Sequence, residues 1–532
     1  MITLKMVVLA SSFALSVGLP QETFFKDMPS VKLHVKFKRE SMKFHGQSEF
    51  DIYATPQVSV NGSSVLYDCY ATLSDNRSNY TYTIKDGAYL TTTDAFRSKT
   101  TQCLPPSLML FNEILPALNN VTPIPSASIG DKAVECTSGN LLKTTFAETN
   151  YAICASGKAG FTAYSSDMDI IVEYLKSPIS IAKPELSATF APCEIVRIET
   201  SFTPAALALA TGGSIPSFSH RQLREESHMI MESSSCNECS TMPRPCIFFH
   251  GSGNEHGMDE LQDTAELLKD KLGDIHGHAP CCSSIKYAVI ETMDAGWRNE
   301  DLQQKFCNFS LSMSPTSDVA AAIIENTIVV THSMGGLVMA GAIANNTCTL
   351  SNTSSWVALS PPMTGSMASD YLIDICGLED SKVRLGFLEK FEQCPAAESR
   401  KSTSYQGEKY SDPIMDEAYI AAQKAYTDNV EAAMCSDSYV GIFSKFQAPS
   451  IFAGTIVKHK SEENDGLVEF QSCVGGLDTG LFGNHYSNSF YRSRLNHADT
   501  AFLTGDGIFR NSQKPNKWFE CLKYNNPRRF RL

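Results

Sequence analysis

The sequence predicts an α/β fold in the C-terminal half of the chain, preceded by a β-rich N-terminal domain. From about residue 245 onward, short β-branched or aromatic runs alternate with helical stretches. This alternation is typical of βαβ units, in which helices cover both faces of a parallel sheet. From about 25 to 205, apolar and polar residues instead alternate one by one, which favours half-buried strands. A chain of 532 residues is long enough for two or three such domains.

The expected strands of the C-terminal half are solid apolar runs, because strands of a parallel sheet are buried on both faces. Between about 377 and 445 the chain is polar and helix-prone, and we expect this insertion to form a helical cap over the strand ends. The expected strands are, in chain order, CIFFHG, IKYAVIETM, NTIVVTHS, SWVALSPP and SIFAGTIV.

Residues 1–18 have the features of a signal peptide. Lys5 supplies the positive charge, a short apolar run follows, and the residues near Gly18 are small. The apolar run is shorter than the roughly 20 residues that a membrane span needs, and it stops at Pro20. We therefore expect a secreted protein with no stable membrane span.

Cysteine usage agrees with export. The chain has 17 cysteines, and only Cys236 and Cys239 have a metal-like spacing, with no second pair to complete a zinc site. Disulfides are therefore expected, and the odd number leaves at least one thiol free or paired outside the chain. Glycosylation is expected at N-x-S/T sequons, which begin at Asn61, Asn76, Asn79, Asn120, Asn308, Asn345 and Asn352.

We expect residues 19–210 to form a β-rich, disulfide-stapled domain and residues 211–244 to form a linker rich in Ser, Gly and Pro. Arg221 and Arg224 in the linker are a candidate processing site. No catalytic constellation stands out in the β-rich domain, and the sequence identifies neither its role nor its partner. The C-terminal domain is expected to span 245–532.

A serine ends the apolar run NTIVVTHS, where a helix of small residues is expected to begin. A serine hydroxyl is a weak nucleophile unless a base takes its proton. A sharp strand-to-helix turn would project Ser333 above the strand ends and place the Met334 backbone N–H at a helix N-terminus, which favours an oxyanion. The segment THSMG resembles the G-x-S-x-G nucleophile elbow of α/β-hydrolases, with Thr331 in place of the first glycine. The alternative is an ordinary turn with an incidental serine.

Two further segments resemble bacterial triacylglycerol lipases of this superfamily. An apolar strand ends in HGSG at 250–253, like the oxyanion loop of those lipases, which implies the Ser252 N–H as a second oxyanion donor. The segment NDGLV at 464–468 resembles the one that carries their triad acid, which implies Asp465 in that role.

The segment RLNHAD resembles the N-H-x-D segment around the triad histidine of the same lipases, which implies His497 as the base. His485 is the alternative, since it also lies downstream of Asp465. In those lipases the Asp of this segment helps to bind calcium. Asp499 occupies that place, but one carboxylate does not make a calcium site of six or more oxygens, and no metal or other cofactor is predicted.

The resemblance covers about 245–510 and implies an α/β-hydrolase fold with a Ser333–His497–Asp465 triad in the chain order of that superfamily. It implies a secreted serine ester hydrolase, a lipase or carboxylesterase, that acts on an ester or lipid through an acyl-enzyme. A lipid thioesterase or acyltransferase would use the same triad, and a non-catalytic, hydrolase-like surface-binding protein stays open. The net charge of −14 and the lack of a long basic run argue against a nucleic-acid partner.

Overall fold

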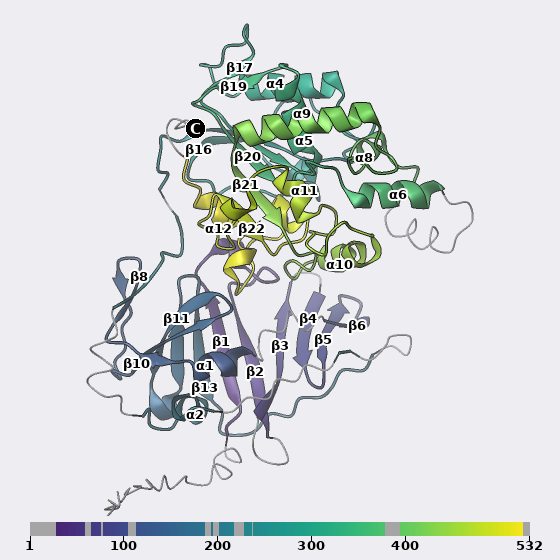
Figure 1. Cartoon of the computed structure of the whole chain (residues 1–532). Coiled ribbons are helices and arrows are strands. Elements are labelled where there is room, and N and C mark those ends of the chain that lie inside the picture. Colours follow the sequence, from purple (N-terminus) through teal and green to yellow (C-terminus); the bar gives the residue numbers. More distant parts are fainter. Residues whose placement is uncertain are drawn as a thin grey trace, which may run out of the picture. The chain divides into compact units, whose positions relative to one another are not determined.

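The chain divides into two compact units. The first comprises Met1–Phe37, Phe44–Phe146 and Asn150–Met231, and the second comprises Lys38–Lys43, Ala147–Thr149 and Glu232–Leu532. Figure 1 colours the first unit mainly purple and blue, and the second mainly teal, green and yellow. The expected signal peptide at 1–18 and the candidate processing site lie outside the described residues. The computed structural model describes residues 28–58, 65–75, 78–104, 113–186, 193–194, 202–216, 228–236, 238–377 and 394–524.

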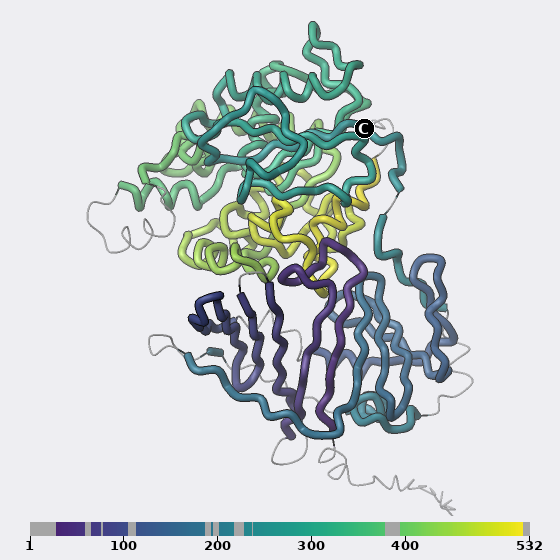
Figure 2. Tube along the Cα trace, turned by 180° about the vertical axis from the view of Figure 1, so that it is seen from behind, coloured from purple at the N-terminus to yellow at the C-terminus, as the bar shows by residue number. Residues whose placement is uncertain are grey.

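An eleven-stranded antiparallel sheet forms the first unit, with the strand order β6-β5-β4-β3-β2-β1-β13-β12-β11-β10-β7. Figure 2 shows its strands side by side. Every second side chain of β1, from Val31 to Phe37, is buried, because successive side chains point to opposite faces of a sheet. The strands are β1 (Val31–Phe37), β2 (Glu49–Val58), β3 (Val65–Ser74), β4 (Ser78–Ile84), β5 (Ala88–Asp94), β6 (Lys99–Cys103), β7 (Thr122–Pro123), β10 (Leu141–Phe146), β11 (Thr149–Ala155), β12 (Phe161–Tyr164) and β13 (Met168–Tyr174).

Smaller elements and two disulfides complete the first unit. Disulfides join Cys103 to Cys193 and Cys136 to Cys154, while Cys69 is buried and free, so the predicted stapling and the predicted odd thiol are confirmed. A three-stranded sheet has the order β14-β8-β9. The remaining elements are α1 (Ile114–Asn119), β8 (Ala127–Ile129), β9 (Lys132–Ala133), α2 (Pro204–Thr211) and β14 (Met229–Met231).

A six-stranded sheet forms the centre of the second unit, with the order β16-β15-β18-β20-β21-β22 and parallel neighbours. Both of its faces are buried. Ile247 and Phe249 pack into one core cluster, whereas Cys246 and Phe248 pack into the other. This two-sided burial explains why these strands are solid apolar runs. The strands are β15 (Arg244–Phe249), β16 (Cys282–Ala288), β18 (Ile328–His332), β20 (Ser355–Leu359), β21 (Val430–Ser436) and β22 (Phe490–Ser493), and a separate pair is β17 (Ile323–Ile324) with β19 (Thr349–Leu350).

Three helices of the second unit lie together, since α4 and α9 both pack against α5 (Figure 1). The side chains that these helices bury include Phe306, Leu337 and Tyr426, which share one core cluster with Phe249 of the sheet. The helices are α4 (Glu300–Ser312), α5 (Met334–Ala344), α6 (Met367–Gly377), α8 (Glu398–Lys401), α9 (Pro413–Asn429), α10 (Gln447–Ile456), α11 (Phe470–Val474) and α12 (Pro515–Glu520). The 3-10 helices are η3 (Glu40–Met42), η6 (Gly157–Ala159), η7 (Glu266–Leu268), η8 (Thr479–Leu481), η9 (Asp499–Ala501) and η10 (Asn511–Gln513).

The predicted fold class, an α/β-hydrolase fold with a helical cap behind a β-rich domain, is wrong. The largest sheet of the chain is the eleven-stranded antiparallel one, so the chain as a whole is β-rich and shows no clear α/β-hydrolase pattern. The sequence interpretation took its fold class from the alternating C-terminal segments. It gave too little weight to the first unit, whose eleven strands form the larger, antiparallel sheet.

The expected helical cap at 377–445 is also wrong. This segment contains α9, which packs against α5, and β21, which lies between β20 and β22 in the six-stranded sheet. The polar residues of α9 suggested a surface insertion, but Tyr419 and Tyr426 on its other face are fully buried. Nor is SIFAGTIV a strand, because it forms most of α10. A short apolar run does not distinguish a strand from a helix by its pattern alone.

The remaining cysteines pair within the second unit, and neither Cys236 nor Cys239 takes part in a metal site, since both form disulfides. The six pairs are Cys236–Cys521, Cys239–Cys281, Cys246–Cys282, Cys307–Cys348, Cys376–Cys394 and Cys435–Cys473. Eight disulfides in one chain are typical of proteins from an oxidising compartment. None of the helices in the described part of the chain is both long and apolar enough to cross a membrane.

Replacing both Cys435 and Cys473 by alanine is expected to lower the free energy of unfolding by about 3 kcal/mol. This disulfide joins β21 to α11 across a sequence separation of 38, so it restricts the unfolded chain. Urea denaturation measures the loss. Cys69→Ala removes a buried thiol without opening a loop and is the control. A double variant that is no less stable than this control would contradict the prediction.

Candidate active site

Ser333 occupies a strained turn between β18 and α5. Its backbone has φ 54° and ψ −132°, a conformation that costs a residue with a Cβ about 1–3 kcal/mol. The Ser333 N–H donates to the Leu359 carbonyl at 2.9 Å, and the Ser333 carbonyl accepts from Gly336 N at 2.9 Å. The neighbours His332 and Met334 are buried, while Ser333 itself is half-buried. The turn therefore presents the serine side chain above a packed strand and helix.

Two glycines allow the loop after β15 to pack directly on this turn. A Cβ on Gly335 would lie 2.6 Å from the His250 carbonyl oxygen, and a Cβ on Gly251 would lie 2.7 Å from the Ser333 Cβ. Both distances are shorter than any ordinary contact between such atoms. The glycine two residues after Ser333 is therefore required by the neighbouring loop.

Thr331 fits the turn because its hydroxyl has a partner. The Trp356 Nε1–H of β20 donates to Thr331 Oγ1 at 2.9 Å, and both residues are fully buried. Glycine at this position would leave the indole N–H without an acceptor, which costs about 1–3 kcal/mol in a buried place. Threonine in place of the first glycine of the elbow pattern thus provides a hydrogen-bond acceptor for the indole N–H of the neighbouring strand β20.

The three residues that the sequence singles out meet through two hydrogen bonds. Ser333 Oγ lies 3.0 Å from His497 Nε2, and His497 Nδ1 lies 2.7 Å from Asp465 Oδ2. An ionised carboxylate only accepts, so Nδ1 carries the proton and Nε2 is left to accept one from the serine hydroxyl. This is the geometry that a serine nucleophile, a general base and an orienting acid require.

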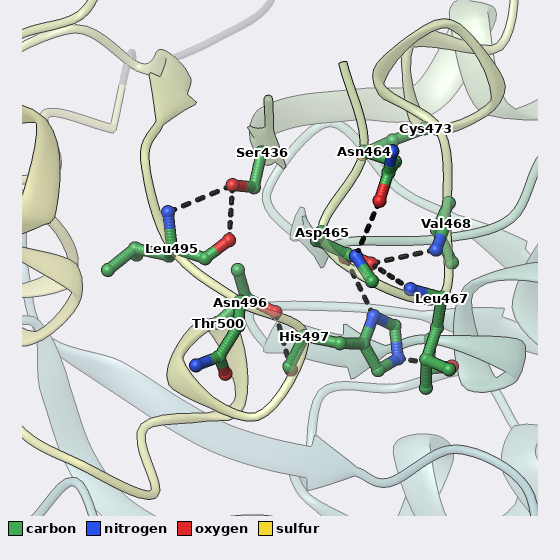
Figure 3. A network of polar contacts seen from close by, with 12 residues as sticks. Ser436, Asn464, Asp465, Leu467, Val468, Cys473, Leu495, Asn496, His497 and Thr500 are labelled. Carbon is green, nitrogen blue, oxygen red and sulfur yellow. Dashed lines mark hydrogen bonds and ion pairs between the residues drawn. The ribbon is translucent and has the colours of Figure 1, made fainter. Parts of the chain in front are cut away.

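Asp465 is held with one oxygen toward the histidine. Its Oδ1 accepts from Leu467 N at 3.0 Å and from Val468 N at 2.7 Å, which leaves Oδ2 for His497. Figure 3 shows the His497 ring directed at Asp465, with Leu467 and Val468 beside the same carboxylate. Burial raises the pKa of Asp465, but the charge and hydrogen bond of His497 and the two backbone N–H groups outweigh it, and the net pKa is lowered. The carboxylate is therefore ionised at neutral pH.

The segment around His497 is fixed by the two polar residues of its motif. Asn496 Oδ1 accepts from the backbone N–H groups of residues 498 and 499, at 3.1 and 3.0 Å. Asp499 Oδ2 accepts from Asn496 N at 3.0 Å and from Ile442 N at 2.8 Å, and its Oδ1 accepts from Thr504 Oγ1 at 2.7 Å. The N-H-x-D pattern is thus explained by backbone hydrogen bonds that hold the loop.

The resemblance places a calcium ligand at Asp499. In the structure, the Asp499 carboxylate instead accepts the hydrogen bonds from Asn496, Ile442 and Thr504. Burial raises its pKa to about 7, against the hydrogen bonds from Ile442, Thr504 and Asn496, and the charge of Asp465 raises it further. Considering only residues with described positions, no group of three or more His, Cys, Asp or Glu side chains is arranged to hold a metal ion.

Ser252 and Met334, the predicted oxyanion donors, line the same pocket as Ser333 and His497. Neither backbone N–H donates to another residue within the described part of the chain. Hydrogen bonds hold the loop that carries Ser252, since the Gly251 carbonyl accepts from His250 Nδ1 at 2.8 Å and from Thr292 Oγ1 at 3.0 Å. Two backbone N–H groups beside a serine hydroxyl can stabilise a negative oxygen in a tetrahedral intermediate.

Two further histidines lie near the site and are neutral. Burial lowers the pKa of His250 to about 4, and its Nε2 accepts from Ile290 N at 3.2 Å. Burial, followed by the charge of His497, lowers the pKa of His332 well below its usual range. The His332 Nε2–H donates to the His497 carbonyl at 3.2 Å, so this ring helps to hold the loop that carries His497. The sequence interpretation gave His332 no role, since nothing in its local pattern indicates this contact.

His485, the alternative base, does not reach the site. Its Nδ1 lies 2.8 Å from Ser487 Oγ, within its own turn. Of the two histidines downstream of Asp465, the structure brings only His497 to Ser333.

The pocket above Ser333 has a volume of about 290 Å³. Most of its wall is apolar and comes from α6, α10 and the neighbouring loops, including Leu372, Phe446, Phe452, Ile456 and Val457. Ligand pockets in proteins start at about this size and are mostly apolar with a few polar groups. Its polar lining includes Ser333, His497 and the carboxylate of Asp270. It also includes two basic side chains, Lys271 and Arg400, which sequence analysis did not single out because no motif contains them.

Neither the family models nor the curated proteins that were compared with the sequence match this chain. The support for a function therefore comes from the geometry of the site.

Thr331→Val keeps the shape of the side chain but removes the acceptor of the Trp356 indole N–H. We expect the free energy of unfolding to fall by about 1–3 kcal/mol, because a buried donor is left unpaired. Chemical denaturation measures the change. Thr331→Ser retains the hydroxyl and serves as the control. Equal losses in the two variants would show that the hydrogen bond contributes little.

Asp499→Asn is expected to flatten the pH dependence of stability. Between its ordinary pKa of 3.8 and about 7, the folded chain keeps a proton on Asp499 that the unfolded chain has released. The stability linked to this group is therefore full at low pH and is lost as the pH rises toward about 7. Thermal unfolding midpoints of both proteins between about pH 4 and about pH 8 measure this. Parallel pH curves for the two proteins would contradict the assignment.

Proposed function

We propose that this protein is a secreted serine ester hydrolase, a lipase or carboxylesterase, that acts through Ser333, His497 and Asp465. The observation that carries the proposal is the hydrogen-bonded series from Ser333 Oγ to His497 to the buried Asp465 carboxylate, which opens into an apolar pocket. The eight disulfides support an oxidising, extracellular destination.

In the proposed mechanism, His497 Nε2 takes the proton of Ser333 as Oγ attacks the ester carbonyl carbon. Asp465 stabilises the imidazolium that forms, and the N–H groups of Ser252 and Met334 donate to the oxyanion. His497 then gives its proton to the leaving alcohol. His497 next takes a proton from a water molecule, whose oxygen attacks the carbonyl carbon of the acyl-enzyme. His497 gives this proton to Ser333 Oγ as the bond between Oγ and the acyl carbon breaks, which releases the acid and restores the serine.

The apolar wall of the pocket favours an acyl chain over a short polar group. Leu372, Phe452 and Ile456 offer a hydrocarbon surface next to the serine, and burying each methylene of a chain there contributes about 0.8 kcal/mol. A lipid thioesterase or acyltransferase would use the same groups and differs only in the bond cleaved or in the acceptor of the acyl group. A non-catalytic surface-binding protein would leave Ser333 unreactive.

Ser333→Ala is expected to lower the hydrolysis of p-nitrophenyl esters at least about a thousandfold, because the nucleophile is lost. The rates are measured on a series of esters from acetate to palmitate. Labelling with a fluorophosphonate, followed by mass spectrometry, is expected to modify Ser333 in the native chain. Esterase activity that persists in Ser333→Ala, or a native chain that resists the label, would refute the proposal.

The two downstream histidines provide a matched control for this test. His497→Ala is expected to lose activity to a similar extent as Ser333→Ala, since both groups act in one unit. His485→Ala removes an imidazole that pairs with Ser487 and is expected to keep full activity.

A further inference from the structure

Two basic side chains in the pocket lie next to the loop that carries Ser252. A Cβ built on Gly253 would lie 3.3 Å from Arg400 Nη2 and 3.4 Å from Lys271 Nζ, so the two cationic groups approach the same point beside this glycine. Both side chains are half-buried, and both line the pocket of Ser333. They come from α8 and from the loop after η7, which are far apart in the sequence.

Neither cation forms an ion pair with a carboxylate among the residues whose positions are described. Burial lowers the pKa of Lys271, and the charge of Arg400 lowers it further, against weaker attraction from Asp270 and Glu255. Both of those carboxylates are exposed. Burial also lowers the pKa of Arg400. Two like charges that are partly removed from water are costly unless an anion joins them.

The cations lie within a short distance of the proposed nucleophile. A Cβ on Gly251 would lie 3.1 Å from Ser333 Oγ, and Gly253 follows two residues later. Two residues of extended chain span at most about 7 Å. A group bound between Lys271 and Arg400 would therefore lie in the same pocket as an ester carbon placed at Ser333, so one substrate molecule can reach both.

We propose that Lys271 and Arg400 form a subsite for an anionic oxygen group, a phosphate or a carboxylate, that the ester substrate carries a few bonds from its scissile bond. This inference rests on the proposed function and names its substrate class, an anionic amphipathic ester. The planar guanidinium of Arg400 suits two oxygens of such a group, and the Lys271 ammonium adds a compact charge. The apolar wall receives the hydrocarbon part of the same molecule.

Two pairs of esters test the subsite with the full chain. Octanoyl glycerol phosphate and octanoyl glycerol differ by a phosphate on the alcohol side, whereas monoethyl suberate and ethyl octanoate differ by a carboxylate on the acyl side. We expect a higher kcat/KM for the anionic member of at least one pair. Arg400→Gln and Lys271→Gln are each expected to lower the anionic-to-neutral ratio of kcat/KM about ten- to a hundredfold, since each removes a charge-assisted hydrogen bond.

Two variants control for folding and for general charge. Arg400→Lys keeps the charge and is expected to retain more of the ratio than Arg400→Gln. Lys401→Gln changes the next residue, whose Nζ pairs with Glu398 Oε1 at 2.7 Å, and is expected to leave the ratio unchanged.

The outcomes separate this inference from the proposed function. Ester hydrolysis without a preference in either pair, or with a ratio that neither glutamine variant changes, would overturn the subsite and leave the hydrolase standing. If no ester is hydrolysed, the subsite is tested by calorimetry, which measures the binding of octanoyl glycerol phosphate to the native chain and to Arg400→Gln. Binding that Arg400→Gln weakens would support the subsite without the reaction, whereas binding that is absent or unaffected would overturn it.

Discussion

The 2.7 Å hydrogen bond between His497 Nδ1 and Asp465 Oδ2 fixes the orientation of the whole site. Asp465 is only 1% exposed, so its charge persists only because donors surround it. Two backbone N–H groups hold one of its oxygens, and the histidine is therefore the remaining partner of the other. With Nδ1 bound in this way, Nε2 points to Ser333 in the tautomer that accepts a proton. Loss of the carboxylate would free the ring to rotate and to exchange its tautomer.

The parallel sheet of the second unit brings these groups together, because carboxyl ends of parallel strands lie at the same edge. Ser333 follows β18, the loop of Ser252 follows β15, and His497 lies in the segment after β22. The strained backbone of Ser333 persists because its surroundings are tightly packed. Gly251 lies directly against the Ser333 side chain, and Gly335 lies directly against the His250 carbonyl. The hydrogen bond from the Trp356 indole to Thr331 joins β20 to β18, the strand that ends at Ser333. The geometry of the Ser333, His497 and Asp465 side chains is thus a property of the packed strand ends.

Sequence patterns identified three side chains that meet in the structure, although the fold class predicted with them is wrong. The Ser333 turn, the Asp465 loop and the His497 loop are each specified by contacts within a few residues, such as the bonds of Asn496 and Asp499, so a short motif contains the necessary information. The fold depends on pairing between distant strands. The run that includes Tyr419 is compatible with both a surface insertion and a buried helix until its partner α5 is known.

The two basic groups of the pocket were not predicted from the sequence, because their proximity also depends on contacts between distant segments. Lys271 and Arg400 are separated by more than a hundred residues, and neither lies in a recognisable motif. A single lysine or arginine in a sequence is most often a solvated surface residue. What distinguishes these two is that the chain brings both beside Gly253 without a carboxylate partner among the described residues.

The charges around Ser333 are distributed in a way that suits acyl transfer. His250 and His332 lie close to the serine but are neutral through burial, so in the proposed mechanism neither would oppose the positive charge that His497 would gain with a proton. The side chains of Lys271 and Arg400 lie instead beside Gly253, in the loop that carries Ser252. In a partly desolvated pocket such charges act more strongly than in water. In the proposed mechanism, the same placement that would bind an anionic substrate would therefore also favour the oxyanion, while the Asp465 carboxylate would balance the charge of the histidine.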